Sequence, residues 1–232
     1  MHDQNTAFLV SHCTWTGLQC DYFFQEVCIM ANNKDRIHIL TESAIMVALA
    51  TVLSMTKVWK APYGGSVTVL AMTPIIILSM RRGIKAGLFA GFAHSIIQLL
   101  LGLNNVSYIP TPMGIMICVL TDYILPYTLL GLGGLFRNVK FSASETLNLF
   151  FATALGALLV CVLRFACHVV SGAVIWYALD LEWYADNPDH IVFRYGPWMF
   201  SVIYNCGYML PETIITVIGT PILTKALSKI KV

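Results

Sequence analysis

One stretch of the chain limits its fold more than any other. Residues 146–178 are almost entirely apolar, yet they carry Arg164 and His168. The stretch is longer than the roughly 20 residues that a helix needs to cross a hydrocarbon layer of about 30 Å. Arg164 and His168 are four residues apart, so they share one face of a helix. Ionisable side chains inside a membrane span are costly and commonly face a bundle interior or a watery cavity, which predicts a functional site on this face.

The overall composition agrees with a chain that lies in a membrane. Of its 232 residues, 57% are hydrophobic and only 11% are charged, and the mean hydropathy is +0.73. Soluble domains usually carry about 25% charged residues, so the composition excludes a soluble globular enzyme. The net charge of +2 gives no indication of a nucleic-acid partner, and we expect none.

The cysteines do not indicate a metal site. Four of the seven, Cys118, Cys161, Cys167 and Cys206, fall within apolar segments, where a free cysteine behaves as a small hydrophobic side chain. The three near the N-terminus are seven and eight residues apart, which is not the spacing of a zinc site. We therefore predict no bound metal.

The apolar segments predict six membrane-spanning helices. They run over about residues 37–55, 67–80, 84–101, 113–135, 146–178 and 197–223. The second segment is short and contains Pro74, and on the third His94 and Gln98 share a face, where we expect them to pack within the bundle. We predict that residues 31–232 form this all-α, six-helix membrane domain. Residues 1–30 are expected to be an N-terminal extension that is weakly ordered or precedes a natural start at Met30.

The distribution of lysine and arginine predicts the orientation of the helices. If both termini are cytoplasmic, ten of the 14 Lys and Arg residues lie on the inner side, and only Lys57, Lys60 and Arg194 lie on the outer side. The remaining one, Arg164, lies within a span. Cytoplasmic loops carry an excess of positive charge, so we predict a multi-pass protein of the cell membrane with both termini in the cytoplasm.

The outer loops contain aromatic, glycine and acidic residues. Residues 59–66 read Trp-Lys-Ala-Pro-Tyr-Gly-Gly-Ser, and the two glycines permit turns that other residues rarely adopt. Such a loop folds over the mouth of a pocket or forms a plain turn, and the residues leave both interpretations open. The loop before the last helix is acidic, with Asp180, Glu182, Asp186 and Asp189.

Three spans carry polar residues at a similar depth. With a rise of about 1.5 Å per residue, Asp122 and His168 lie roughly 15 Å from the outer ends of their helices, and Asn205 lies about 12 Å from its own. Arg164 is one turn deeper. We predict that these side chains form one pocket in the outer half of the membrane. A structural role is also open for each residue alone, because Asp122 could neutralise Arg164, and His168 or Asn205 could link helices by hydrogen bonds.

Aromatic residues near this pocket indicate what it binds. Trp176 and Tyr204 are common packing residues by themselves, but beside a carboxylate they suit a cation or an aromatic ring, so we count them among the site residues. Arg164 would repel a cation unless Asp122 or Glu212 neutralises it. The residues therefore predict a small heteroaromatic or cationic solute.

The chain lacks the motifs of ATP hydrolysis and of common catalysis. It contains no Gly-x-x-x-x-Gly-Lys-Ser/Thr loop and no convincing Ser/His/Asp or metal-binding motif. We predict that it is not an enzyme and that any energy for pumping comes from a partner or from ions. On the first span, Ala44 and Ala48 are small residues four apart, which allows another helix to approach closely, although alanine is common in membrane spans.

Five stretches of the chain resemble one family of membrane proteins. They are Pro-Tyr-Gly-Gly-Ser-Val (residues 62–67), Arg-Arg-Gly-Ile-Lys-Ala-Gly (81–87), Asp-Tyr (122–123), Leu-Arg-Phe-Ala-Cys-His-Val-Val-Ser-Gly-Ala (163–173) and Tyr-Asn-Cys-Gly-Tyr-Met-Leu-Pro (204–211). From about residue 37 to its end, the chain resembles the thiamine-specific S-component, or substrate-binding subunit, of energy-coupling-factor (ECF) vitamin transporters. The patterns Arg-x-x-x-His-x-x-x-Gly and Tyr-Asn-x-x-Tyr-Met-x-Pro are specific in combination.

The resemblance implies a six-helix S-component that captures thiamine from outside the cell and holds no cofactor. In this family an acid–tyrosine pair on helix four, matching Asp122 and Tyr123, sets the acid against the positive thiazolium ring of thiamine. The other contacts that the resemblance implies match Arg164, His168, Trp176 and Asn205 in this chain.

The chain departs from the family pattern at three positions. Phe200 stands where some members carry a tyrosine, so the hydroxyl contact of that tyrosine is absent. Gly65 stands where some members carry a tryptophan, and Tyr63 or Trp59 is expected to replace that ring. Asp122 is shorter than the glutamate of other members, which is expected to shift the ligand slightly.

The resemblance also implies partners. The face with Ala44 and Ala48 matches the docking surface for a membrane coupling subunit, which joins two ATPases, and only those ATPases use ATP. Two other functions stay open: an S-component for another vitamin or precursor, such as riboflavin or hydroxymethylpyrimidine, and a stand-alone ion-coupled carrier of small heteroaromatic cations. A membrane enzyme that uses His168 and Asp122 is a third alternative, with no nucleophile at a suitable spacing.

Overall fold

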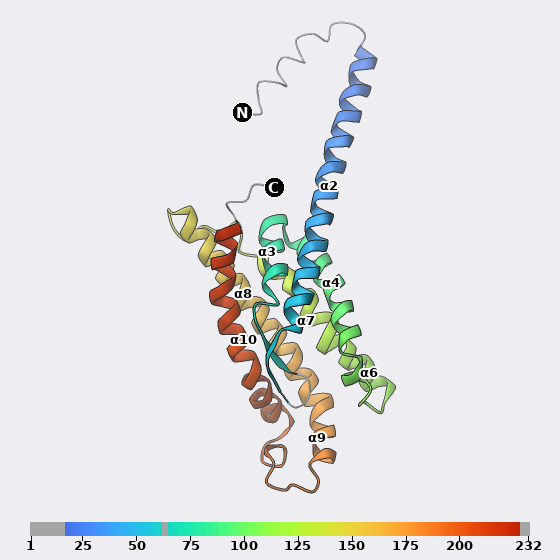
Figure 1. Cartoon of the computed structure of the whole chain (residues 1–232), viewed down its shortest axis with the longest axis vertical. Coiled ribbons are helices and arrows are strands. Elements are labelled where there is room, and N and C mark those ends of the chain that lie inside the picture. Colours follow the sequence, from blue (N-terminus) through green and yellow to red (C-terminus); the bar gives the residue numbers. More distant parts are fainter. Residues whose placement is uncertain (1–16, 62–64, 228–232) are drawn as a thin grey trace. The chain divides into compact units, whose positions relative to one another are not determined.

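A computed structural model describes residues 17–61 and 65–227 (Figure 1). The chain divides into two compact units, Met1–Thr41 and Glu42–Val232, and the candidate site lies entirely in the second. Residues 1–16 of the predicted extension lie outside the described residues. The helix α2 (Gly17–Met55) includes the rest of it, because no glycine or proline after Gly17 interrupts the helix before it ends at Met55.

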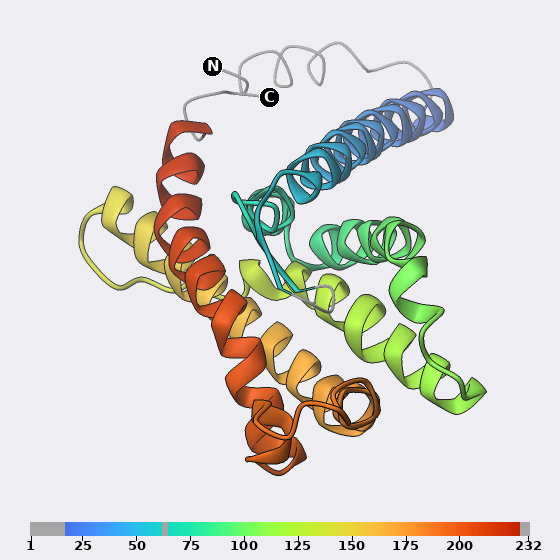
Figure 2. The same ribbon diagram turned by 60° about the horizontal axis from the view of Figure 1, so that its bottom comes forward.

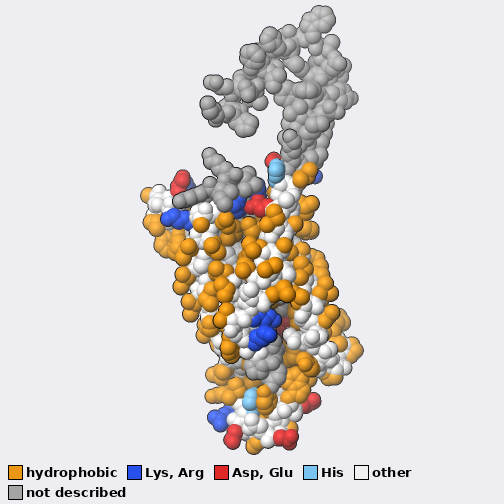
Figure 3. All heavy atoms as spheres, viewed as in Figure 1, with side chains coloured by type: hydrophobic (Ala, Val, Ile, Leu, Met, Phe, Trp, Pro, Cys, Tyr) orange, Lys and Arg blue, Asp and Glu red, His pale blue; other side chains and the backbone are white. Residues whose placement is uncertain are grey.

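Five helical segments among the described residues are long and apolar enough to cross a membrane. They are Asp35–Met55, Ile84–Leu101, Pro112–Gly134, Glu145–Trp183 and Pro197–Leu227. Large hydrophobic side chains such as Leu49, Phe89 and Met116 are exposed on them, and Figure 3 shows hydrophobic side chains covering the sides of the helices. So much exposed apolar surface suits contact with lipid. The protein is an integral membrane helical bundle, which confirms the predicted fold class.

The predicted second span is a short helix at the centre of the second unit. α3 (Thr73–Arg82) has 10 residues, and all its side chains from Thr73 to Met80 are buried. It packs against α4, α8, α10 and the 3-10 helix η2. A helix of this length does not cross a hydrocarbon layer of about 30 Å, so the predicted number of six spans stays a prediction.

The remaining helices follow α3 in the chain. They are α4 (Ile84–Leu101), α5 (Leu103–Val106), α6 (Pro112–Cys118), η1 (Val119–Ile124), α7 (Leu125–Thr128), η2 (Leu129–Gly134), α8 (Glu145–Ser171), η3 (Gly172–Trp176), α9 (Tyr177–Trp183), η4 (Ile191–Phe193) and α10 (Pro197–Leu227). Figures 1 and 2 show α10 running along α8, and the two helices pack closely. α8 also approaches η2, where a Cβ on Gly156 would meet the backbone of Gly133. Small residues allow such close approach between helices in membranes.

Two of the long segments contain a wide π-helical turn. η1 interrupts the fourth predicted span and contains Asp122 and Tyr123, and η3 interrupts the fifth and ends at Trp176. Pro126 follows η1 and lacks the N–H that would bond to the carbonyl of Asp122 four residues earlier. Single π-helical turns inside α-helices occur frequently at functional sites, and both of these turns contain residues of the predicted pocket.

A short antiparallel hairpin joins α2 to α3. β1 (Lys57–Lys60) pairs with β2 (Ser66–Thr68), so that Lys57 lies opposite Thr68 and Lys60 opposite Ser66. The register shifts between Lys57 and Trp59, because β1 contains one extra residue there. The sequence did not predict these strands, since segments of four and three residues are too short to show a clear alternation.

Candidate functional site

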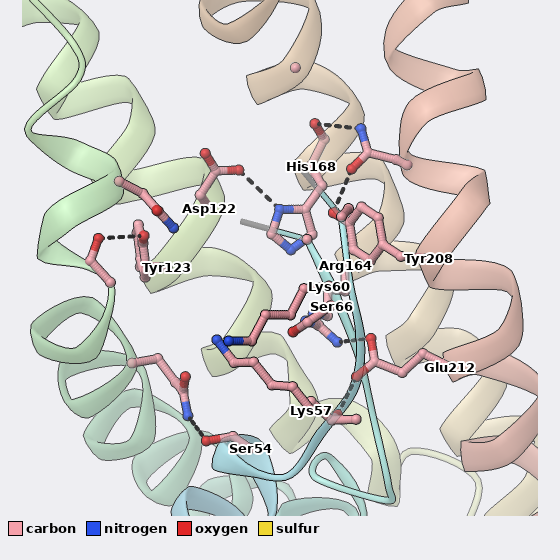
Figure 4. A pocket seen from close by; sticks show the side chains of 18 of the residues that line it. Ser54, Lys57, Lys60, Ser66, Asp122, Tyr123, Arg164, His168, Tyr208 and Glu212 are labelled. Carbon is pink, nitrogen blue, oxygen red and sulfur yellow. Dashed lines mark hydrogen bonds and ion pairs between the residues drawn. The ribbon is translucent and has the colours of Figure 1, made fainter. Parts of the chain in front are cut away.

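A cavity of about 390 Å³ lies between the hairpin and the helices α4, α8 and α10 (Figure 4). Its volume is within the range of small-molecule sites. Charged, amide, hydroxyl and aromatic side chains line it, together with apolar ones. The hairpin forms part of its wall through Ser66 and Thr68, so described residues of the loop 59–66, for which a lid and a plain turn are both open, contribute directly to the cavity.

Asp122 is the centre of a hydrogen-bonded cluster on the cavity wall. Its Oδ1 lies 2.9 Å from Nδ1 of His168. Its Oδ2 accepts hydrogen bonds from Ser171 Oγ at 2.5 Å, Trp176 Nε1 at 3.0 Å and Cys118 Sγ at 3.4 Å. Three of these donors come from one continuous segment, α8 followed by η3, so Asp122 fixes the position of that segment relative to η1.

His168 directs one ring nitrogen to Asp122 and the other has no partner in the part of the chain that the structure describes. Because a carboxylate only accepts hydrogen bonds, Nδ1 of His168 donates to Asp122. The other nitrogen, Nε2, is buried and has no hydrogen-bond partner among the described residues. The ring points into the cavity in Figure 4. Buried polar atoms are normally paired, so this nitrogen is available to a bound molecule.

Arg164 pairs with Glu212 on α10, and this pair settles which acid neutralises the arginine. Nη1 of Arg164 donates to Glu212 Oε2 at 2.9 Å, and both side chains are buried. Glu212 Oε1 accepts a further hydrogen bond from Thr68 Oγ1 at 2.5 Å. The alternative that Asp122 neutralises Arg164 is therefore wrong, because Asp122 pairs with His168 instead. The guanidinium also lies over the ring of Tyr127, 5.2 Å from its centroid, a favourable cation–π contact.

Asn205 connects α10 to α8 and also lines the cavity. Its amide donates to the backbone carbonyl of His168 at 3.3 Å and to that of Ser201 at 2.9 Å. Its Oδ1 accepts a hydrogen bond from the Tyr208 hydroxyl at 2.6 Å. The helix-linking role and the predicted place at the pocket are thus both present in one side chain.

A row of aromatic rings follows one face of α10. Phe200, Tyr204 and Tyr208 are four residues apart, and all three line the cavity. The centroids of neighbouring rings are 6.3 Å and 6.0 Å apart. Such a row offers flat apolar surface to a heteroaromatic or cationic ligand.

Comparisons with known proteins decide the family. Residues 40–232 match the family model described as "Thiamine transporter protein (Thia_YuaJ)". The chain belongs to this family. It is 31% identical to the thiamine transporter ThiT of Bacillus subtilis over 192 residues, which is 81% of this chain and 90% of the relative. It is 28% identical to ThiT of Lacticaseibacillus paracasei over 203 residues, which is 84% of this chain and 90% of that relative.

A solved structure of the thiamine transporter family has the same fold. ThiT from Listeria monocytogenes superposes with a TM-score of 0.64 at 26% sequence identity, covering 84% of this chain and 97% of the other. The match extends over nearly the whole of the related protein, so the bundle described here is the family fold.

Nine of the ten predicted site residues line the one cavity of this thiamine transporter family member. They are Gly65, Asp122, Tyr123, Arg164, His168, Trp176, Phe200, Tyr204 and Asn205. The tenth, Tyr63, lies outside the described residues, and Trp59, the other ring considered for this place, is half exposed. Their contact with a ligand stays a prediction.

Gly65 lies where a larger residue would meet Tyr208. A Cβ built on Gly65 would be 2.5 Å from Cε1 of the Tyr208 ring, closer than atoms in contact can lie. In this chain the ring of Tyr208 therefore fills the space beside the hairpin that a side chain at position 65 would need. Tyr208 follows Tyr204 by one helical turn, and this spacing in the sequence predicts that Tyr208 shares the cavity face of the helix.

Several residues line the cavity although the sequence does not predict them there. Asp180, predicted in an outer loop, is on helix α9, is 2% exposed and lines the cavity. His94 and Gln98, predicted as packing residues, also line it. His94 remains a packing residue as well, since its ring makes an edge contact with Tyr127 at 5.3 Å.

Two lysines of β1 also face the cavity. Successive residues of a regular strand point to opposite faces, so Lys57 and Lys60 would lie on different faces. The extra residue between Lys57 and Trp59 brings both lysines to the cavity side, as in Figure 4. Together with Arg164 they oppose three carboxylates in the lining, those of Asp122, Asp180 and Glu212, so the formal charges of the lining cancel.

The remaining predictions concern metals and the docking face. Within the part of the chain that the structure describes, no three His, Cys, Asp or Glu side chains group as metal ligands would. Ala44 and Ala48 are both exposed on α2. Docking of a partner at these two residues stays a prediction.

Proposed function

We propose that this protein is the substrate-binding subunit of an ATP-driven ECF importer and that it captures extracellular thiamine without acting as an enzyme. One observation supports this most: in a chain of the thiamine transporter family, the cavity wall carries a partly buried carboxylate, Asp122, within a set of four hydrogen-bond donors. Hydrogen bonds from such donors favour the charged form of a carboxylate, and a negative charge on the cavity wall suits a cationic ligand.

The chemistry of thiamine suits this lining. Thiamine has a permanently charged thiazolium ring, an aminopyrimidine ring and a hydroxyethyl chain. In the proposal the field of Asp122 attracts the thiazolium, and the rings of Trp176 and Tyr204 pack on the flat faces of the ligand. The free Nε2 of His168 hydrogen-bonds to a polar atom of the ligand.

The other predicted contacts belong to the same proposal. Arg164, held by Glu212, gives the pocket a fixed inner wall rather than a free positive charge. Phe200 supplies an apolar edge, and Tyr123, whose hydroxyl donates to the carbonyl of Gly102 at 3.0 Å, holds η1 beside the end of α4. Gly65 and Tyr63 of the hairpin loop complete the set.

We further propose the partners and the placement in the membrane. Residues 31–232 form the substrate-binding domain, with residues 1–30 as an extension before it. The excess of Lys and Arg on one side of the membrane supports a placement with both termini in the cytoplasm. The exposed face with Ala44 and Ala48 docks on the membrane coupling subunit, which joins two ATPases, and the protein itself needs no cofactor.

Ligand identification tests the proposal. The protein is purified without added vitamin, the small molecules released on unfolding are identified by mass spectrometry, and the emptied protein is titrated with thiamine, riboflavin and hydroxymethylpyrimidine. We expect thiamine in the released fraction and saturable binding of thiamine alone. Preferential binding of either other compound would make this an S-component for a different ligand.

A transport assay separates the importer from a stand-alone carrier. Vesicles that contain only this protein are compared with vesicles that also contain the coupling subunit and both ATPases. The proposal expects thiamine uptake only in the second set and only with ATP inside the compartment that holds the ATPases. Uptake by the protein alone under an ion gradient would support the carrier and contradict the importer.

A further inference from the structure

Asp180 is a buried carboxylate for which the described residues provide no hydrogen-bond or ion-pair partner. It lies on α9, it is 2% exposed, and it lines the cavity. Its Oδ1 is buried and has no hydrogen-bond partner within residues 17–61 and 65–227. Neither of the cavity lysines forms an ion pair with it in that part of the chain.

An acid in this position is costly unless something supplies a donor. Buried polar groups are nearly always hydrogen-bonded, and buried charges are nearly always paired. Among the described residues Asp180 has neither a hydrogen bond nor a paired charge, and it lines a cavity of about 390 Å³. A molecule in that cavity is therefore the natural source of the missing donor.

The two aspartates of the cavity differ in this respect. A carboxylate has about four lone-pair positions, and Asp122 already accepts from His168, Ser171, Trp176 and Cys118. Asp122 thus acts on a ligand mainly through its charge, while Asp180 has an oxygen that is free to accept a hydrogen bond.

Asp180 lies at a different place in the cavity from Asp122, so the two carboxylates would contact different parts of a ligand. It follows Trp176 by four residues, or about 6 Å along the helix axis, and both side chains line the cavity. The indole N–H of Trp176 is directed at Asp122. Asp180 therefore lies one helical turn beyond Trp176, at the end of the segment that is further from Arg164.

We propose that Asp180 accepts a hydrogen bond from an amino or hydroxyl group of the bound ligand, and that it is a specificity-determining residue of the cavity. This rests on the proposed function, because thiamine has one such donor at each end, the amino group of the pyrimidine and the hydroxyl group of the ethyl chain. Asp122 attracts the charged ring between them, and Asp180 selects for the donor.

Two substitutions of Asp180 test the inference by calorimetric titration with thiamine. Asp180→Ala removes the acceptor, and we expect its Kd to rise about ten- to hundredfold, the range for a hydrogen bond to a charged group. Asp180→Asn keeps the size and one neutral acceptor, so its Kd is expected to lie between those of Asp180→Ala and wild type. The matched control is Asp189→Asn, an exposed acid of the following loop, with wild-type affinity expected.

The unfolding temperature of the ligand-free protein separates ligand contact from a structural role. Because Asp180 has no partner among residues 17–61 and 65–227, ligand-free Asp180→Ala is expected to unfold at the wild-type temperature or higher. Its gain in unfolding temperature on adding thiamine is expected to be smaller than that of wild type. A structural residue would instead lower the unfolding temperature of the ligand-free protein, and that result would overturn the inference.

Two analogues of thiamine identify the donor. One has an ethyl chain in place of the hydroxyethyl chain, and the other has an oxo group in place of the amino group. Wild type is expected to bind each analogue more weakly than thiamine. Asp180→Ala is expected to bind one of the two analogues as tightly as it binds thiamine, and the group that this analogue lacks is then the donor to Asp180. The inference would be overturned, with the proposed function intact, by either of two results. One is equal thiamine affinity of Asp180→Ala and wild type, and the other is that Asp180→Ala loses as much affinity for each analogue as wild type does. Failure of wild type to bind thiamine would overturn the proposed function and this inference together.

Discussion

Arg164 on α8 and Glu212 on α10 form a buried ion pair, with Nη1 and Oε2 2.9 Å apart. The same carboxylate accepts a hydrogen bond from Thr68 of the hairpin. Three segments that are far apart in the chain therefore meet at Glu212, and the pair forms one wall of the cavity. Its geometry makes the hairpin, α8 and α10 dependent on one another.

Removing one partner of this pair is expected to destabilise the bundle strongly. Glu212→Gln or Arg164→Met leaves a buried charge without its counter-ion, which costs about 3–5 kcal/mol. The double variant removes both charges and is expected to recover a large part of that loss. Unfolding of the three variants in detergent measures the coupling, and additive losses in the double variant would mean that the two side chains do not interact.

Asp122→Asn is expected to weaken thiamine binding roughly ten- to hundredfold, since charged hydrogen-bonded groups contribute about 1.5–3 kcal/mol. The amide removes the negative charge, and its NH₂ group cannot accept from Ser171 or Trp176. Titration followed by intrinsic tryptophan fluorescence gives the affinity. Asp186→Asn, an exposed acid, serves as the control. Unchanged affinity in Asp122→Asn would remove Asp122 from its proposed role.

Trp176→Phe is expected to abolish most of the fluorescence change on binding. Of the tryptophans in the described residues, only Trp176 lines the cavity, and its environment changes most when a ligand enters. Trp198, more than half exposed, provides the comparison: Trp198→Phe is expected to keep the signal. A full signal in Trp176→Phe would place the ligand elsewhere.

Gly65→Ala is expected to cost about 1–3 kcal/mol of stability, as overpacking does. The added methyl group would meet the Tyr208 ring at 2.5 Å, and moving that ring breaks its hydrogen bond to Asn205. Gly207→Ala is the matched control because a Cβ there has nothing within 4 Å. Unfolding temperatures and thiamine affinities of both variants check this, and equal behaviour would show that Tyr208 does not restrict position 65.

Ala44→Leu with Ala48→Leu is expected to separate binding from transport. Both residues are exposed on α2, so larger side chains leave the fold and the cavity intact but prevent close approach of a partner helix. Thiamine affinity should match wild type, while uptake in vesicles with the coupling subunit and ATPases should fall severalfold or more. Ala166→Leu, at an exposed alanine of α8, is expected to leave uptake unchanged. Normal uptake in the double variant would place the docking face elsewhere.

The convergence of Asp122, His168 and Asn205 could be predicted because helices have a constant rise. Counting residues from each end of a span gives a depth. Polar residues in an apolar bundle face its interior, so those at equal depths are expected to lie close together. The choice of partner for Arg164 could not be predicted in this way. It depends on how far each helix is rotated about its axis, and Glu212 and Asp122 were equally possible from depth and charge.

The other differences arise from local irregularities of the backbone. Lys57 and Lys60 share a face only because one extra residue in β1 shifts the register, and no sequence period reports such a bulge. The sequence predicts Asp180 in a loop because the apolar stretch ends at Ala178, whereas the helical segment continues to Trp183. Its spacing of four from Trp176 was visible, and it would have placed Asp180 on the cavity face.

A structure determined with thiamine bound tests the central claim most directly. We expect density for one thiamine molecule in the cavity, with its thiazolium ring beside Asp122, a polar atom within hydrogen-bond distance of His168 Nε2, and rings from α10 along its face. Density for thiamine at any other place on the protein, with this cavity empty, would contradict the account.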